Sequence, residues 1–129
     1  MLIANVELRS GRHLKKELEI RTKAFALAII ATVGNLRKGK AADVIGYQLL
    51  KSGTSIGANY REANRAQSHD DFIHKIAICE KEAAETEYWL ELLIESGLVS
   101  AENCHNLVRE ARELLAIFVA SGRTAKSRR

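Results

Sequence analysis

The amino-acid sequence predicts an all-α protein that folds as an antiparallel up-down-up-down four-helix bundle. Three observations lead to this prediction: the chain contains no proline, apolar residues recur at spacings of three and four along four long segments, and short polar stretches separate those segments. Short connections make consecutive long helices antiparallel neighbours. With 129 residues, the chain has the length of one domain.

The first two helices are expected between residues 13 and 66. Gly34 and the Lys-Gly-Lys sequence at 38–40 end the first helix. Its core spacing passes through Leu14, Leu18, Thr22, Phe25, Ile29, Thr32 and Leu36. The second helix spans about 41–66, and Asp43 in its first turn suits the positive end of the helix dipole. Its core spacing passes through Ile45, Leu49, Ser52, Ile56, Asn59 and Ala63.

The last two helices carry clearer start and stop signals. Ser68 starts the third helix and Gly97 stops it, while Ser100 caps the fourth helix and Gly122 ends it. The core spacing of the third helix holds for three heptads, through Phe72, Ile76, Cys79, Ala83, Thr86, Leu90 and Leu93. That of the fourth passes through Cys104, Leu107, Ala111, Leu114 and Phe118.

These boundaries predict three parts of the chain. Residues 1–12 are expected to form a flexible N-terminal segment, residues 13–122 the four-helix bundle, and residues 123–129 a basic C-terminal tail.

A second stripe on the second helix contains three glycines. It passes through Gly46, Leu50, Gly53, Gly57 and Asn64. Because each glycine costs helix stability of about 1 kcal/mol, something should compensate for them. The favoured interpretation is close helix contact, within the bundle or with another subunit; the alternative is that they are tolerated on the surface.

Charge is divided unevenly along the chain. Residues 1–65 contain twelve Lys or Arg and five Asp or Glu, whereas residues 66–122 contain four and eleven. A basic surface on the first two helices can therefore meet an acidic surface on the last two helices of another subunit. Such a heterologous contact forms a ring when its rotation closes, so we expect a homo-oligomer.

Other features predict a cytoplasmic protein without a membrane partner. The longest apolar run, residues 24–33, is about half as long as a bilayer crossing requires. The N-terminus lacks the long apolar region and cleavage site of a secretion signal. Cys79 and Cys104 are expected to lie about 20 Å apart in height, too far for a disulfide.

No set of residues suggests an enzyme, a metal site or a cofactor. Asp71 with His74 and Glu102 with His105 have the spacing of bundle metal ligands, but antiparallel helices place these pairs at opposite ends. A glycine-rich phosphate loop and a positioned cysteine–histidine pair are also missing from the sequence. We therefore expect no catalytic residues, no metal ligands and no cofactor-binding residues.

Glutamates crowd the third helix, and two interpretations stay open. The first is a solvated acidic face that forms pairs along the helix, such as Lys81 with Glu85. The second is that one carboxylate, best assigned to Glu85, meets Ser52 or another polar group of the second helix inside the bundle, or faces a basic neighbour.

The central stretch resembles a known family. The sequence QLLKSGTSIGANYREA at 48–63, the Asp-Phe pair at 71–72 and KIAICEKEAAETEYWLELL at 75–93 are similar to the four-helix bundle proteins of 23S rRNA intervening sequences. Ser55, Ile56, Asn59, Glu62, Glu85 and Leu90 coincide best with the family pattern. We assign structural roles in the family motif to Ser55, Gly57, Asn59, Glu62 and Glu85.

The resemblance implies an up-and-down bundle that assembles into a homo-oligomer, commonly a pentameric ring, and it implies no established activity. The accessory protein of diversity-generating retroelements is related, forms such a ring and is basic enough to engage nucleic acid.

The expected function is non-catalytic binding of RNA or DNA by an oligomer, through phosphate contacts from basic side chains. The candidate contacts are Lys15, Lys16, Arg37, Lys38, Lys40, Arg61, Arg65, Arg123, Lys126, Arg128 and Arg129. The alternative is a protein–protein interaction scaffold without nucleic-acid binding, in which Tyr88 and Trp89 lie at an interface.

Overall fold

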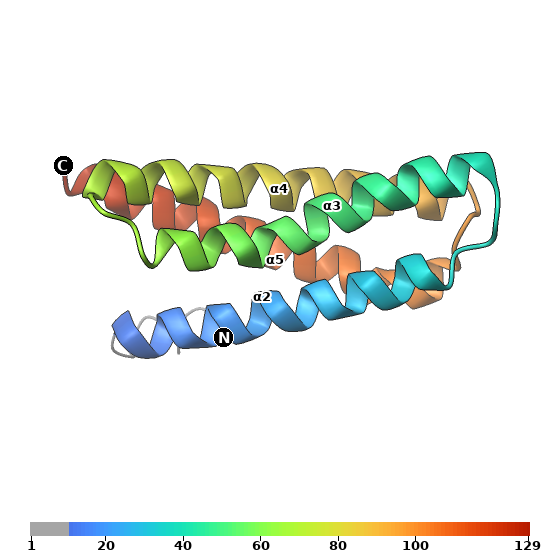
Figure 1. The fold of residues 1–129 in the computed structure, drawn as a ribbon, viewed down its shortest axis with the longest axis horizontal. Helices are drawn as coiled ribbons and strands as arrows, with labels where there is room; N and C mark the ends of the chain where they lie inside the picture. Colours follow the sequence, from blue (N-terminus) through green and yellow to red (C-terminus); the bar gives the residue numbers. More distant parts are fainter. Residues whose placement is uncertain (1–10) are drawn as a thin grey trace.

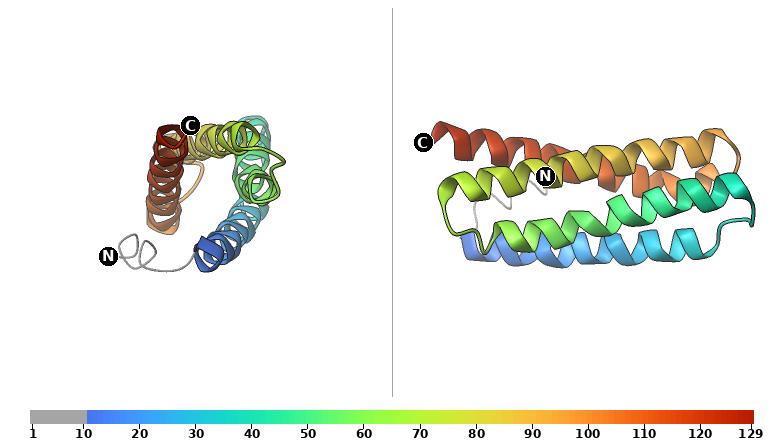
Figure 2. Two further views of the ribbon diagram at one scale, coloured as in Figure 1. Left: turned by 90° about the vertical axis from the view of Figure 1, so that its left-hand side faces the viewer. Right: turned by 45° about the horizontal axis from the view of Figure 1, so that its top comes forward.

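A computed structural model describes residues 11–129, which form four helices. They are α2 (Gly11–Gly34), α3 (Lys40–Ala63), α4 (His69–Glu95) and α5 (Ala101–Ser127). Consecutive helices run in opposite directions along the long axis of the molecule (Figure 1). Viewed end-on, they follow one another around that axis in chain order (Figure 2). The predicted all-α four-helix bundle is confirmed, and most of the expected flexible segment at 1–12 lies outside the described residues.

The predicted boundaries of α4 are correct because local hydrogen bonds fix them. The Ser68 hydroxyl accepts a hydrogen bond from the backbone N–H of Asp71 at 3.0 Å, which caps the first turn. At the other end Gly97 has φ of 77°, a left-handed conformation that favours glycine. The N–H of Leu98 then donates to the carbonyl of Leu93 at 3.0 Å, which closes the helix as a Schellman motif.

Helix α5 is longer than predicted. Gly122 is buried within the helix, which continues to Ser127, so the expected end at Gly122 is wrong. The buried Ala125 extends the apolar spacing of Phe118 and Gly122 by a further turn. Residues 123–127 are therefore helical, and their basic side chains occupy defined positions on α5.

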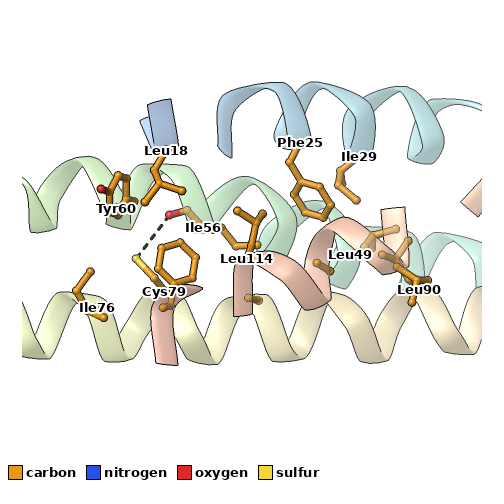
Figure 3. Packing of buried hydrophobic residues seen from close by; sticks show 14 of the residues in the cluster. Leu18, Phe25, Ile29, Leu49, Ile56, Tyr60, Ile76, Cys79, Leu90 and Leu114 are labelled. Carbon is orange, nitrogen blue, oxygen red and sulfur yellow. Dashed lines mark hydrogen bonds between the residues drawn. The ribbon is translucent and has the colours of Figure 1, made fainter. Parts of the chain in front are cut away.

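The core runs the length of the bundle and contains most of the predicted residues (Figure 3). Thr32 and Asn59, which were also predicted at core positions, are only half-buried. Ile29, Leu49, Ile56, Leu90 and Phe118 are all fully inaccessible to solvent. The thiol of Cys79 points towards the carbonyl of Ile56, with Sγ and O 3.8 Å apart. Both cysteines are buried and free, in agreement with the prediction that they form no disulfide.

The glycine stripe of α3 packs directly against α2. A Cβ atom built on Gly53 would lie 2.9 Å from both γ-carbons of Ile29, and one on Gly57 would lie 3.0 Å from the Thr22 hydroxyl oxygen. A Cβ atom built on Gly46 would likewise lie 2.9 Å from Cδ1 of Leu36. The predicted close contact is thus confirmed, and the structure places it within the bundle.

The fourth side of the bundle is packed much more sparsely. Helices α2 and α5 share far fewer contacts than any two consecutive helices. Their principal polar contact is between Arg21 and the carboxylates of Glu110 and Glu113. Within residues 11–129, no helix has the length and apolar character that a bilayer crossing requires.

Candidate functional site

The polar groups inside the bundle form a structural contact. The hydroxyl oxygens of Ser52 and Thr86 lie 3.0 Å apart, and Thr86 also lies 2.7 Å from the carbonyl oxygen of Glu82. The buried partner of Ser52 is therefore Thr86, and the proposal that Glu85 meets Ser52 is wrong. Both hydroxyls are satisfied by neighbours, so this pair joins α3 to α4.

The ionisable groups of the core are held in their neutral forms. Burial raises the pKa of Cys79 to about 12. Burial also raises the pKa of Tyr60 to about 12, and the pKa of Cys104 moves in the same direction for the same reason. A thiol that keeps its proton is a poor nucleophile and a poor metal ligand. Within the part of the chain that the structure describes, no group of three or more His, Cys, Asp or Glu side chains is arranged so that it could hold a metal ion.

Basic side chains gather at one end of the bundle, which we call the basic end. It comprises residues 13–20 of α2, residues 60–76 with the α3–α4 connection, and residues 121–129 of α5. Antiparallel packing brings these three segments to the same end (Figure 1). Together they contain nine Lys or Arg and five Asp or Glu.

Contacts between α4 and α5 position the last part of this end. The ring nitrogen Nε2 of His69, the first residue of α4, lies 2.7 Å from the carbonyl oxygen of Ala125 in α5. Arg129 Nε lies 3.5 Å from Asp70 Oδ1. The basic residues that the sequence assigned to a tail are therefore attached beside the α3–α4 connection.

Ion pairs neutralise some of the charges at the basic end and leave others free. Glu19 pairs with Arg61 at 3.8 Å and accepts a hydrogen bond from Asn64 at 2.9 Å. Glu62 pairs with Lys75 at 3.8 Å. At the basic end, the exposed cations that form no ion pair within residues 11–129 are Lys15, Lys16, Arg65, Arg123, Lys126 and Arg128. These six side chains give the end an uncompensated positive charge.

Three predicted contacts lie elsewhere. Arg37, Lys38 and Lys40 belong to the α2–α3 connection at the opposite end of the bundle. There, residues 32–47 and 88–108 contain three Lys or Arg against four Asp or Glu. The structure thus divides the predicted contacts between two ends, and only one end has a clear excess of positive charge.

A recess of about 500 Å³ lies near that opposite end. Its lining includes Asn35 and Arg37 after α2, Ser100 before α5, and the buried Cys104. Ser100 occupies the N-cap position of α5, yet its side chain makes no capping hydrogen bond. Burial raises the pKa of Cys104, so its thiol keeps its proton, and the exposed Arg37 places one cation at the recess.

The family-motif residues make contacts within α3 and with its neighbours α2 and α4. Within α3, the Asn59 side chain donates to the carbonyl of Ser55 at 2.8 Å, and the Ser55 hydroxyl donates to the carbonyl of Lys51 at 2.5 Å. Glu62 forms the ion pair with Lys75, and Gly57 provides the close approach of Thr22. The half-buried Glu85 acts electrostatically on Glu82. Through these contacts Glu62 joins α3 to α4, and Gly57 lets α3 approach α2.

Sequence reasoning missed the importance of His69 and Ala125. The signal for Ala125 was present in the sequence. Gly122 follows Phe118 after four residues and Ala125 follows Gly122 after three, which continues the helical core spacing. His69 offered no such signal, because its partner is a backbone carbonyl 56 residues away.

Comparisons with known proteins agree with this architecture. The model of the family described as "23S rRNA-intervening sequence protein" matches residues 16–120. A protein with unknown function from the S23 ribosomal protein family of Bacteroides thetaiotaomicron VPI-5482, with a crystal structure at 1.70 Å resolution, is 38% identical to this chain. The similarity covers 84% of this chain and 97% of that chain, with a TM-score of 0.78. The comparison with curated proteins gives no match.

Proposed function

The chain belongs to the family of 23S rRNA-intervening sequence proteins, and from this premise we propose that it is a non-catalytic, homo-oligomeric protein that binds RNA or DNA at its basic end. The ligand groups would be backbone phosphates. The resemblance implies a ring of five subunits.

One observation carries this proposal: six exposed cations without ion pairs share one end of the bundle. They come from α2, from the α3–α4 connection and from the end of α5, so a rigid scaffold holds them at a fixed spacing. Lysine and arginine in such an arrangement neutralise phosphates and release counterions, which gives affinity without reading base sequence. Repetition of this end in an oligomer would multiply a weak attraction.

The aromatic residues support backbone binding over base recognition. Single-stranded nucleic acids are read by stacking bases on exposed aromatic rings. Tyr60 lies near the basic end but is buried, and its ring packs against Phe118 with centroids 5.8 Å apart. The exposed tyrosines, Tyr47 and Tyr88, belong to the other half of the bundle. The described part of the basic end therefore offers charge and no exposed aromatic platform.

A salt series tests the proposal. Binding of a random-sequence RNA and of duplex DNA is measured by fluorescence anisotropy between about 50 and 300 mM salt, with wild type and two triple variants. In the first variant Arg65, Arg123 and Lys126 become glutamine. In the matched control Arg37, Lys38 and Lys40 become glutamine, which removes the same charge from the opposite end.

The wild type should bind with an affinity that falls steeply with salt. In the basic-end variant the slope of log K against log salt should decrease by about 2 to 3, since each lost phosphate contact contributes about 0.7 to 0.9. The control variant should keep most of the wild-type slope. Absence of binding at low salt would reject nucleic acid and favour the protein scaffold instead. Equal losses in both variants would show attraction to net charge and no localised site.

A further inference from the structure

The outer face of α2 carries a row of large apolar side chains that no other part of residues 11–129 covers. Ile20, Leu27 and Ile30 are 61%, 58% and 48% exposed. They lie on the side of the helix away from Leu18 and Phe25, which are buried in the core. We call these three side chains the α2 ridge. A helix with apolar residues on two opposite faces has a second surface to bury.

A shallow apolar groove lies on a different side of the bundle, between α4 and α5. It has a volume of about 440 Å³ and is lined by Ala77, Glu80, Lys81, Ala84, Leu115 and Val119. We call it the α4–α5 groove. On the α4 side the two alanines are the small residues of the lining, and the longer side chains of Glu80 and Lys81 lie between them on the same helix face.

The ridge and the groove have the same repeat. Ile20 and Leu27 are seven residues apart, as are Ala77 and Ala84, so both pairs are spaced by about 10.5 Å along their helices. This matching puts two large residues opposite two small ones, the arrangement of knobs and holes in packed helices.

The charges beside these residues are complementary. Lys16 and Lys23 flank the ridge, are exposed and are also seven residues apart. Glu80 lies at the groove, and Glu87 follows it on α4 after the same interval. When the ridge enters the groove, the two lysines therefore face Glu80 and Glu87, of which Glu87 also binds Arg112 of its own subunit at 2.6 Å. One positive charge, Lys81, also borders the groove, so the net complementarity comes from the glutamates of α4.

We propose that the α2 ridge of one copy of this chain packs into the α4–α5 groove of a second copy. The inference rests on the homo-oligomeric part of the proposed function and specifies its contact surface. Since the ridge and the groove are different surfaces, the contact is heterologous, and each subunit keeps one ridge and one groove for further neighbours. The contact uses the sides of the bundle, so the basic end stays accessible except at Lys16, which borders the ridge.

Two single substitutions at exposed positions test the contact. Leu27→Glu places a charge on the ridge, and Ala84→Glu fills the groove, while neither position belongs to the core. Tyr47→Glu, at a 62% exposed apolar position on α3, is the matched control. Mass is measured by sedimentation and light scattering, and thermal unfolding monitored by circular dichroism checks that each variant is folded.

The wild type and the control should have the mass of an oligomer, and both test variants should be monomeric. An equimolar mixture of the two test variants should then form dimers and nothing larger. The Leu27→Glu copy still has an intact groove, and the Ala84→Glu copy still has an intact ridge. A symmetric contact between two α2 ridges predicts a different result, because Ala84→Glu would assemble normally and the mixture would gain no dimer.

Crosslinking provides a measurement that does not depend on the strength of a single contact. A Leu27→Cys copy is mixed under mild oxidation with an Ala77→Cys copy or an Ala84→Cys copy, while the native cysteines stay buried. One of these mixtures should give a disulfide-linked dimer, and Tyr47→Cys should give none with either partner.

Three results would overturn the inference: a monomeric wild type, an oligomer that survives Leu27→Glu, or failure of both crosslinks. Anisotropy of labelled RNA is measured on the same samples, so the two proposals fail separately. A monomeric wild type that still binds RNA rejects the contact only, whereas an oligomer that ignores RNA rejects the nucleic-acid function only.

Discussion

The guanidinium of Arg21 on α2 binds both carboxylate oxygens of Glu110 on α5. The Nε–Oε2 and Nη2–Oε1 distances are each 2.7 Å, and Glu113 adds a third contact at 3.2 Å. The hydrogen bonds that Arg21 donates to Glu110 are the largest cause of the raised pKa of Arg21, so the guanidinium keeps its charge. Because α2 and α5 share few other contacts, this pair is the main link across that side of the bundle.

Replacing Arg21 by methionine should lower the free energy of unfolding by about 1 to 2 kcal/mol. This is the range expected when hydrogen bonds to a charged group are lost and water partly screens the remaining carboxylates. Urea unfolding followed by circular dichroism measures the change.

Arg112 provides the control for that experiment. It also binds a glutamate, with Nε 2.6 Å from Glu87 Oε2, but its side chain is 61% exposed and the pair joins α4 to α5, which are already well packed. Arg112→Met should therefore destabilise the protein less than Arg21→Met. Equal effects would mean that the α2–α5 link has no special importance.

Adding one methyl group at Gly53 should destabilise the protein. Gly53→Ala gains about 1 kcal/mol in helix propensity, but its Cβ would lie 2.9 Å from both γ-carbons of Ile29. Overpacking of this kind costs about 1 to 3 kcal/mol, so a net loss of about 1 kcal/mol is expected. In an Ile29→Ala background the same substitution should cost less, and a double-mutant cycle measures this coupling.

Gly46→Ala should have a different result, although the gap there is equally short. The atom it approaches is Cδ1 of Leu36, the far end of a flexible side chain that can move aside. We therefore expect a neutral or slightly stabilising change, up to about 1 kcal/mol. A loss as large as that of Gly53→Ala would show that Leu36 is held rigidly.

Truncation after Gly122 should weaken the fold. The deleted residues include the buried Ala125 and the carbonyl that contacts His69. Loss of this turn should cost about 1 to 2 kcal/mol, measured by thermal unfolding. Truncation after Ser127 removes only Arg128 and Arg129 and should leave the melting temperature nearly unchanged. If both truncations behave alike, the last helical turn does not contribute to stability.

Glu82 should make stability depend on pH. Burial first, and then the Glu85 carboxylate, raise its pKa above the ordinary value of 4.5. The folded state therefore holds the proton of Glu82 more tightly than the unfolded state does. The contribution of Glu82 to the free energy of unfolding falls as pH rises from 4.5 through the folded pKa. Glu82→Gln should be more stable than the wild type at neutral pH, and the two should converge in acid. Glu95→Gln, at an exposed position, controls for the loss of one charge.

The fold could be predicted because its signals are local and periodic. The Ser68 cap, the Gly97 stop and the seven-residue spacing of the α4 core each depend on residues close together in the chain. The glycine stripe was equally informative, since glycines at helix-packing positions require a close neighbour. The end of α5 was misjudged because Gly122 has the composition of a stop signal, whereas buried packing keeps it helical.

The candidate site could be predicted only in part because it depends on which helix ends meet. The sequence identified the basic residues but assigned them to helices and a tail. Only antiparallel packing, together with the contact between His69 and Ala125, separates Arg37 and Lys38 from Arg65 and Arg123. The partner of Ser52 was missed for a related reason. A carboxylate was the stronger candidate by charge, but the neutral Thr86 hydroxyl costs less to bury.

The sparse contact between α2 and α5 also affects how the protein opens. Helix α4 packs against neighbours on both sides, whereas α2 is packed closely only against α3. Local unfolding with α2 detached should therefore be the least costly excursion of the native state, with α3, α4 and α5 still folded together. In hydrogen exchange, the central amides of α2 should lose protection at a lower free energy than those of α4. The first step of unfolding would then expose Phe25 and Ile29, the residues that otherwise close the core.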